Sequence, residues 1–209
     1  MHRLPYLLLL LLGVLLPAAA RAVEPAGTVT RVQGSATATM SNGFARTLYV
    51  ESTVLVGDRL QTASGARLQI RLSDGATVTL GEDSEMTIEV YGRAEDDGLG
   101  VLKAVSGAFL AASGALAKLG PDRMTIETPS AVLGVRGTEV WGRIRDETSV
   151  EVALLSGTGV VVLTPEGTAD MTEPGTGLTV GVGTAPPAPT PWSAERLAAA
   201  AASVAFDGD

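Results

Sequence analysis

The sequence predicts an all-β fold, a twisted stack or sandwich of short strands followed by a Pro-rich linker and one C-terminal helix. From Thr28 onward, short segments of alternating apolar and polar residues follow one another, separated by Gly, Asp and Asn. Helical periodicity is absent from this part, and Val, Leu and Ile supply its apolar positions. We therefore expect one domain, divided as signal peptide 1–22, β domain 23–183, linker 184–191, and helix and tail 192–209.

The first residues have the features of a secretory signal peptide. Arg3 supplies a basic start, Leu7 to Leu16 an apolar core, and Ala20-Arg21-Ala22 a small-x-small cleavage site. A retained membrane anchor is the alternative, but the apolar run is shorter than the roughly 20 residues that a spanning helix needs. We therefore expect cleavage near Ala22 and a periplasmic or secreted mature chain that does not span the membrane.

The composition is acidic and contains no cysteine. The formal net charge is −8, and loss of Arg3 and Arg21 with the signal peptide lowers it to −10. This balance argues against nucleic acid or an anionic membrane surface as a partner. Without cysteine, disulfides, thiolate metal sites, thiol nucleophiles and a lipid-attachment cysteine are excluded.

The clearest strand is the segment 66–72, which is apolar at even positions and polar at odd ones. The segment 76–80 alternates in the same way. The Asp74-Gly75 pair between them predicts a hairpin with a type I′ turn, which requires positive φ at both central residues. The alternation continues in a further strand through Met86, Ile88 and Val90.

The middle of the chain contains an acidic turn and a long apolar run. Glu95-Asp96-Asp97-Gly98 predicts a solvated turn; a calcium site is the alternative, although the spaced ligands of an EF-hand loop are missing. The run from Leu99 to Leu119 is interrupted by lysines and glycines, so we do not interpret it as a membrane span. We expect a strand from Leu99 to Leu110 and a loop to Pro121, with a short helix at 111–119 as the alternative.

The stretch from Thr128 to Val140 is interpreted as a bent strand, because Pro129 and two glycines make a helix there costly. Three more strands are expected after it, at 150–155, 159–163 and 178–182. The turns between them are expected at Ser156-Gly157 and at Pro165-Glu166-Gly167.

The C-terminal segment differs from the β domain in composition. Residues 184–191 predict a stiff, extended linker. The alanine-rich segment 192–206 predicts a helix with Thr190 as N-cap and Pro191 at the first helical position. Two roles stay open: the helix caps an open end of the β stack, or it is held away as a docking element for a partner. Capping would bury Trp192, Leu197 and Val204.

Groups that could carry catalysis are scarce. The only histidine, His2, lies in the predicted signal peptide, so the mature chain has neither His nor Cys as a base, nucleophile or soft metal ligand. We expect no enzyme activity, no catalytic residue, no metal site and no cofactor. The nearest alternatives are better interpreted as loop and turn residues: Ser113 with Lys118, and the carboxylates Glu82, Asp83 and Glu85.

Arg136, Trp141 and Trp192 are the candidate interaction residues, because Arg and Trp often anchor protein interfaces. Each of the first two also has a structural interpretation. Arg136 can pair with a neighbouring carboxylate, and Trp141 can cover the core from one side of its strand.

Five short motifs occur in order between residues 50 and 157: Gly57-Asp58, Thr62 with Ala66, Asp74-Gly75 with Leu80, Thr128-Pro129, and Gly137-Thr138. In this order they resemble the FecR domain family, the periplasmic part of ferric-citrate-type sensor proteins. The resemblance covers about half of the chain. It implies a non-enzymatic domain at 23–183 that acts by protein–protein contact in the cell envelope, in signalling.

In the membrane sensors of this family, a cytoplasmic anti-sigma region and a spanning helix precede the domain. We expect both to be absent here, so that the chain supplies a sensing module to a separate protein partner. Two other functions stay open. A glycan- or small-molecule-binding module needs Trp141 and Tyr91 to lie together in a pocket, and a structural subunit of an envelope assembly would pair its edge strands with neighbours.

Overall fold

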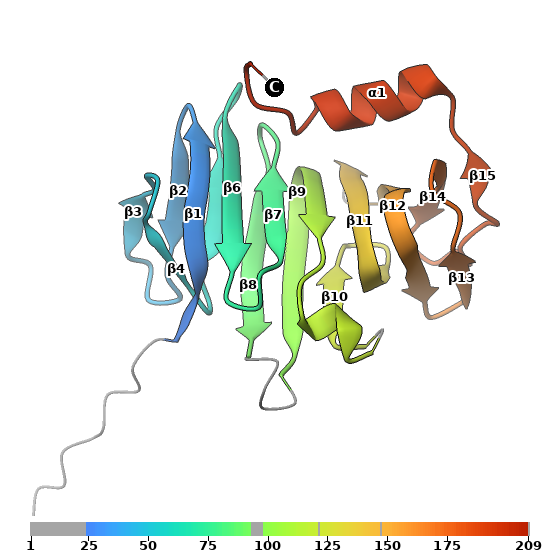
Figure 1. Cartoon of the computed structure of the whole chain (residues 1–209), viewed down its shortest axis with the longest axis horizontal. Helices are drawn as coiled ribbons and strands as arrows, with labels where there is room; N and C mark the ends of the chain where they lie inside the picture. The colour runs from blue at the N-terminus through green and yellow to red at the C-terminus, as the bar shows by residue number, and fades with distance from the viewer. Residues whose placement is uncertain (1–23, 93–97, 121, 147, 209) are drawn as a thin grey trace, which may run out of the picture.

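The computed structural model describes residues 24–92, 98–120, 122–146 and 148–208. The predicted signal peptide and most of the acidic turn at 95–98 lie outside these ranges. Within them the chain forms fifteen β-strands, a short 3₁₀ helix (η2) and one α-helix (α1). The prediction of an all-β fold with one C-terminal helix is confirmed (Figure 1).

Most strands are short, and the longest lie in the middle of the chain. Branched aliphatic residues and threonine recur along them, as suits a pleated and half-buried surface. The strands are β1 (Pro25–Gln33), β2 (Ala36–Thr39), β3 (Ala45–Thr47), β4 (Thr53–Leu55), β5 (Arg59–Thr62), β6 (Arg67–Leu72), β7 (Thr77–Leu80), β8 (Glu85–Tyr91), β9 (Gly100–Ala112), β10 (Met124–Glu127), β11 (Val132–Asp146), β12 (Ser149–Thr164), β13 (Gly167–Met171), β14 (Thr176–Gly181) and β15 (Thr190–Pro191), with η2 at Leu116–Lys118 and α1 at Ala194–Ala202.

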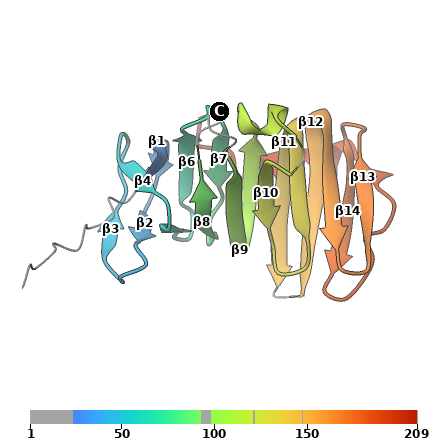
Figure 2. The same cartoon turned by 90° about the horizontal axis from the view of Figure 1, so that it is seen from below.

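The strands form one continuous, open sheet that folds over into two layers (Figures 1 and 2). The first layer, sheet A, has the order β4-β1-β6-β7-β9-β11-β12-β14-β15. The second layer, sheet B, has the order β3-β2-β5-β8-β9-β10-β11-β12-β13. Strands β9, β11 and β12 belong to both layers, because each is long enough to cross from one to the other.

The crossings occur at glycines. β9, β11 and β12 change layer near Gly107, Gly137 and Gly157, whose φ angles are +77°, +52° and +99°, a region that glycine enters at little cost. The predicted bent strand is thus present in β11, and the bend lies at Gly137. The turn expected at Ser156-Gly157 is wrong: the chain only bends there, and β12 continues to Thr164. The sequence prediction also missed β13.

The first residues of the predicted bent strand form a turn instead. Thr128 donates hydrogen bonds from its N–H and its Oγ1 to the Ala131 carbonyl, both at 2.8 Å. Pro129 fits this turn because its ring fixes φ near the value that the second turn residue needs. The turn closes a hairpin in which β10 and β11 pair antiparallel.

The predicted hairpin at Asp74-Gly75 joins β6 and β7, which pair antiparallel from Arg71–Thr77 to Leu68–Leu80. Its turn type was wrong, because only Gly75 has a positive φ (+88°). The Gly75 N–H donates to the Leu72 carbonyl at 3.0 Å, which closes a three-residue loop with glycine in the left-handed position.

Two expectations around β8 and β9 have different outcomes. The strand from Leu99 to Leu110 is confirmed as β9, followed by η2 rather than a longer helix. In β8 the register shifts between Ile88 and Val90, so that Val90 is 43% exposed instead of inward.

The core lies between the two layers, where inward side chains of both sheets meet. Aliphatic residues dominate it because aromatic residues are few in the chain. The largest fully buried side chains are Phe109, Leu48, Leu60, Leu68, Ile70, Leu80, Met86, Ile88, Leu102, Leu116, Met124 and Ile126.

The C-terminal segment packs on the outer face of sheet A, and in Figure 1 it runs across the top of the strands. Ala200 of α1, together with Trp192 before the helix and Val204 after it, packs on outward side chains of β9, β11 and β12. Beyond α1, the Phe206 ring lies 4.0 Å from the Arg31 guanidinium on β1, and the Asp207 N–H donates to the Gln33 amide oxygen at 2.9 Å. The segment therefore covers a sheet face, whereas the two roles predicted for it were a cap on an open end of the stack and a docking element held away from it.

The helix also begins later than predicted. Ser193, rather than Thr190, is the N-cap, and its Oγ accepts from the Arg196 N–H at 3.2 Å. Thr190 and Pro191 are extended and pair with β14 as β15. Proline has no N–H to donate, so the outermost position of a sheet suits it.

Candidate functional site

The Gly57-Asp58 motif ties two strands together. Asp58 is fully buried, and its carboxylate accepts hydrogen bonds from the Arg46 guanidinium of β3, with Nη1 at 2.9 Å and Nη2 closer still. The same carboxylate accepts from the Leu55 N–H at 2.8 Å. A buried carboxylate needs such partners, so Asp58 has a structural role.

Thr62 and Thr138 also form hydrogen bonds within the fold, Thr62 to the segment between β7 and β8 and Thr138 beside the bend of β12. The Thr62 hydroxyl donates to the Gly81 carbonyl at 2.6 Å and accepts from the Ser84 N–H at 3.0 Å. The Thr138 hydroxyl donates to the Ser156 carbonyl next to the bend of β12, and its N–H donates to Ser113 Oγ at 2.8 Å.

Asp74 is the most connected motif residue. Its carboxylate accepts from the Ala76 N–H at 2.9 Å, the Leu116 N–H at 3.0 Å and the Tyr91 hydroxyl at 2.6 Å. Burial raises the pKa of Tyr91, and the hydrogen bond to Asp74 and its negative charge raise it further. Tyr91 therefore stays a hydrogen-bond donor at physiological pH. Asp74 connects the β6–β7 turn with η2 and the end of β8.

Trp141 and Trp192 lie together beneath α1. Trp141 points outward from β11, and the two rings meet edge to face with centroids 5.8 Å apart. Trp141 Nε1 donates to Ser203 Oγ at 3.0 Å. Trp192 packs against β14, where Gly177 leaves room for the ring. Both rings are almost fully buried, so they hold α1 on the sheet.

Three arginines surround this pair of rings. The Arg196 guanidinium lies 3.7 Å from the Trp192 ring centroid, and that of Arg143 lies 5.4 Å from Trp141. Arg145 and Arg196 both pair with Glu151 on β12, at 3.0 and 2.7 Å. Burial disfavours the charged form of Glu151, but the hydrogen bonds and charges of these arginines outweigh it and lower its pKa.

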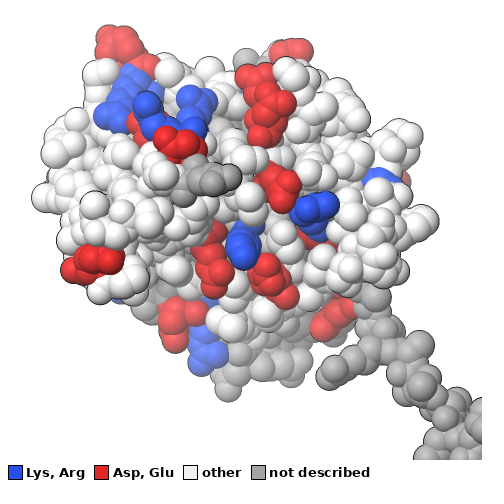
Figure 3. Space-filling view, turned by 180° about the vertical axis from the view of Figure 1, so that it is seen from behind, with Lys and Arg blue, Asp and Glu red and all other residues white. Residues whose placement is uncertain are grey.

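A hollow of about 190 Å³ opens between these side chains. We call its charged and aromatic lining the Arg–Trp site: Trp141, Arg143, Arg145, Glu151, Trp192 and Arg196. Basic side chains gather at the upper left of Figure 3, over the end of the stack where α1 begins, and elsewhere on that face they are scattered.

Arg136 lies apart from this site. Its side chain is exposed near the bend of β11, and among the described residues it forms no ion pair. The carboxylates considered for catalysis are used in the fold: Glu82 accepts from the Gly65 N–H at 2.9 Å and Glu85 from the Gln61 amide at 2.8 Å. In the described ranges, no group of His, Asp and Glu side chains is arranged to hold a metal ion.

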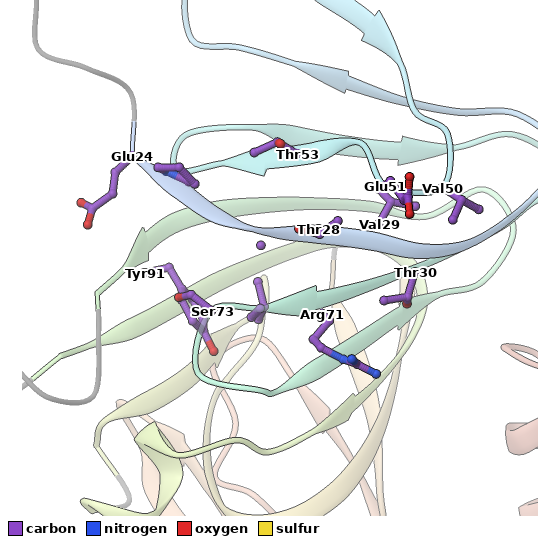
Figure 4. A pocket seen from close by; sticks show the side chains of 13 residues that line it. Glu24, Thr28, Val29, Thr30, Val50, Glu51, Thr53, Arg71, Ser73 and Tyr91 are labelled. Carbon is purple, nitrogen blue, oxygen red and sulfur yellow. The ribbon is translucent and has the colours of Figure 1, made fainter.

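A second hollow, of about 750 Å³, runs along β1. Figure 4 shows β1 crossing it, with Thr53 and Glu51 on one side and Arg71, Ser73 and Tyr91 on the other. Trp141 is not part of its lining. The aromatic pair that a glycan site would need is therefore not brought together here.

The sequence contained a signal for the Arg–Trp site that was not used. Trp141, Arg143 and Arg145 alternate along β11, so they share one face of the strand. Arg196 and Glu151 could not be added from sequence alone, because their positions depend on how the C-terminal segment crosses the sheet.

Comparison with known proteins identifies the domain. Residues 58–158 match the family model described as FecR protein. The chain contains a FecR domain. The domain spans β5 to the bend of β12, and Asp58 is its first residue, so the resemblance seen in the motifs is confirmed. No curated protein matches the chain.

Two crystal structures of a protein from Parabacteroides distasonis, described as a "putative anti-sigma factor", share the fold. At 1.65 Å resolution the TM-score is 0.53 with 16% sequence identity, over 68% of this chain and 63% of the other. At 2.50 Å resolution the TM-score is 0.52 with 16% identity, over 68% and 62%. The chain thus spans less than two thirds of that protein's length. Among the described residues, no helix is long and apolar enough to cross a membrane.

Proposed function

We propose that the chain is an exported, non-enzymatic FecR-domain protein that acts by contact with another protein in the cell envelope. The FecR match over 58–158 carries this proposal, because the family's sensors work through protein contacts. The description of the Parabacteroides distasonis protein as an anti-sigma factor agrees with a signalling role. The signal-peptide features of residues 1–22 support export to the periplasm.

The hydrogen bonds of the motif side chains support a function in protein–protein contact rather than in catalysis. Asp58, Thr62, Asp74 and Thr138 all bond to partners within the fold, and the predicted mature chain has no histidine or cysteine. A partner protein would therefore contact the surface of the domain rather than these motif side chains.

Two surfaces suit a partner better than the edges of sheet A do. On β4 the Thr53 carbonyl accepts from Arg46 at 3.1 Å and the Leu55 N–H donates to Asp58, so this edge is occupied. The other edge of sheet A ends in the two residues of β15. The remaining surfaces are the outer face of sheet B, which no helix covers in the described chain, and the Arg–Trp site.

Photocrosslinking in intact cells tests the proposal. A photoreactive residue is placed at Lys103, exposed on the outer face of sheet B, or at Ala199, beside the Arg–Trp site. Glu166, exposed in the β12–β13 turn, is the control position. We expect one of the two surfaces, but not Glu166, to give a single adduct with one envelope protein. The absence of a specific adduct at both surfaces would overturn the proposal.

A further inference from the structure

The Arg–Trp site concentrates positive charge on a chain whose formal net charge is −8. Three guanidinium groups line its hollow, and Glu151 is the only carboxylate in the described lining. The acidic surface of the chain as a whole repels an anionic partner. Such a partner therefore binds most favourably where positive charge is in local excess.

The neighbouring carboxylates offset two of these arginines. Glu151 binds Arg145 and Arg196. Asp146 lies near Arg145 but accepts hydrogen bonds from Thr148 and Ser149, which lower its pKa. Glu195, in the first turn of α1, is bonded to its own N–H and to Ser193, and its pKa is lowered too. Both therefore remain charged at neutral pH.

Arg143 is the arginine of this site that forms an ion pair with none of these carboxylates. It stands directly opposite Glu151 in the β11–β12 ladder, yet among the described residues it forms no ion pair, and its guanidinium lies over the Trp141 ring. Glu151 turns instead to Arg145 and Arg196. The donors of Arg143 thus remain available at the mouth of a partly buried hollow, where a charge-assisted hydrogen bond is stronger than in open water.

The geometry suits a carboxylate. Glu151 already shows how guanidinium groups at this site receive one, with nitrogen–oxygen distances of 2.7 and 3.0 Å. A hollow of about 190 Å³ has room for a group the size of one side chain. The indole rings and Ala199 and Ala200 give it an apolar wall for the methylene groups of that side chain. Clustered Trp and Arg are also the residues that most often dominate protein interfaces.

We propose that the Arg–Trp site binds a Glu or Asp side chain of an acidic segment in a protein partner, with Arg143 as the principal contact. The proposal rests on the proposed function only in taking the partner to be a protein. Binding of a model acidic peptide can therefore be measured without knowing that partner, and its failure would leave contact through sheet B untouched.

The test uses intrinsic fluorescence, because the only two tryptophans of the chain both lie in the Arg–Trp site. The chain from Val23 to Asp209 is titrated with a hexaglutamate peptide, with hexaglutamine as the uncharged control. We expect a saturable change with hexaglutamate only, weakened by salt near about 0.5 M. Arg143→Gln should raise the dissociation constant about tenfold by removing one charge-assisted contact.

Arg136→Gln is the matched control, since Arg136 is also exposed, lacks an ion pair among the described residues and lies outside the hollow. It should bind hexaglutamate as the unchanged chain does. Arg143→Lys keeps the charge but loses the planar fork, so it should fall between the two. An equal thermal midpoint for the variants shows that the fold is retained.

Three outcomes would overturn the proposal. The first is no saturable change with hexaglutamate. The second is equal affinity for the unchanged chain and for Arg143→Gln. The third is saturation by inorganic phosphate with no binding of the peptide, which would make this a site for small anions rather than for an acidic segment.

Discussion

The outer faces of the two sheets have the same alternation of side chains, but the C-terminal segment covers only the outer face of sheet A in the described chain. On sheet A the outward residues of β9, β11 and β12 include Ala108, Trp141 and Ala153, all buried beneath the C-terminal segment. On sheet B the outward residues in one row across β8, β9 and β10 are Thr87, Lys103 and Glu127, and the described chain leaves them uncovered.

The difference shows how a sequence marks a covered face. Small residues at outward positions allow a helix to approach the sheet closely, and a large aromatic residue among them supplies the area that holds it there. Threonine and charged residues at outward positions indicate a face that stays in water. The C-terminal segment is therefore part of the fold of sheet A rather than an appendage.

The largest expected effect is the loss of the covering segment. A chain that ends at Gly183 lacks Trp192 and Phe206, whose burial should contribute about 3–6 kcal/mol at about 1.5–3 kcal/mol for each large side chain. Its midpoint in urea denaturation should fall clearly below that of the chain ending at Asp209. An unchanged midpoint would mean that the segment does not stabilise the sheet.

A smaller change can loosen the same contact. A Cβ atom at Gly177 would lie 2.3 Å from the Trp192 ring, so Gly177→Ala should force the ring outward and cost about 1–3 kcal/mol. Gly181 lies on the same face of β14 and has space for a Cβ. Gly181→Ala is the control, and equal urea midpoints for both variants would contradict the close packing.

The turn at Gly75 touches neither outer face, so a substitution there is a reference for the packing changes described above. Gly75 has φ +88° and open space around its Cα, so the cost of a side chain there is conformational. Gly75→Val should lower the free energy of unfolding by about 1 kcal/mol, whereas Gly75→Asn, which tolerates this conformation, should cost less. Equal thermal midpoints for Gly75→Val and Gly75→Asn would contradict a left-handed conformation at this turn.

The smallest effect should appear as a pH dependence at the Arg–Trp site. The pKa of Glu151 is lowered in the folded chain, so the carboxylate stabilises the fold above its unfolded pKa of about 4.5 and loses this contribution as pH falls further. Both arginines are about half exposed, so Glu151→Gln should cost only about 0.5–1 kcal/mol at pH 7. Urea midpoints of the two chains should converge as pH falls below the folded pKa of Glu151, and a constant gap would contradict the shift.

Much of this fold was accessible from the sequence because alternation and turn residues act locally. The segments 66–72 and 76–80 and their hairpin followed from a period of two and an Asp-Gly pair. The type of that turn did not follow, because Asp74 bonds to Leu116 and Tyr91, which are distant in the chain. The bend at Gly157 was predicted as a turn, since local sequence does not show that β12 continues into the second layer.

The candidate site was less accessible for the same reason. Trp141 and Trp192 were identified singly as interaction residues, but their contact depends on the path of the C-terminal segment over the sheet. The role of Arg143 depends on Glu151 pairing with Arg145 and Arg196 rather than with Arg143. These side chains come from β11, β12 and α1, so the outcome depends on the tertiary fold.

Thiol labelling tests the contrast between the two faces most directly, because the chain has no cysteine of its own. Ala153→Cys places a thiol on the outer face of sheet A, beneath α1, and Lys103→Cys places one on the outer face of sheet B. We expect slow labelling by iodoacetamide at position 153, because α1 covers it, and fast labelling at position 103. In a chain that ends at Gly183, labelling at position 153 should become fast. Equal rates at both positions in the full mature chain would contradict this contrast between the faces.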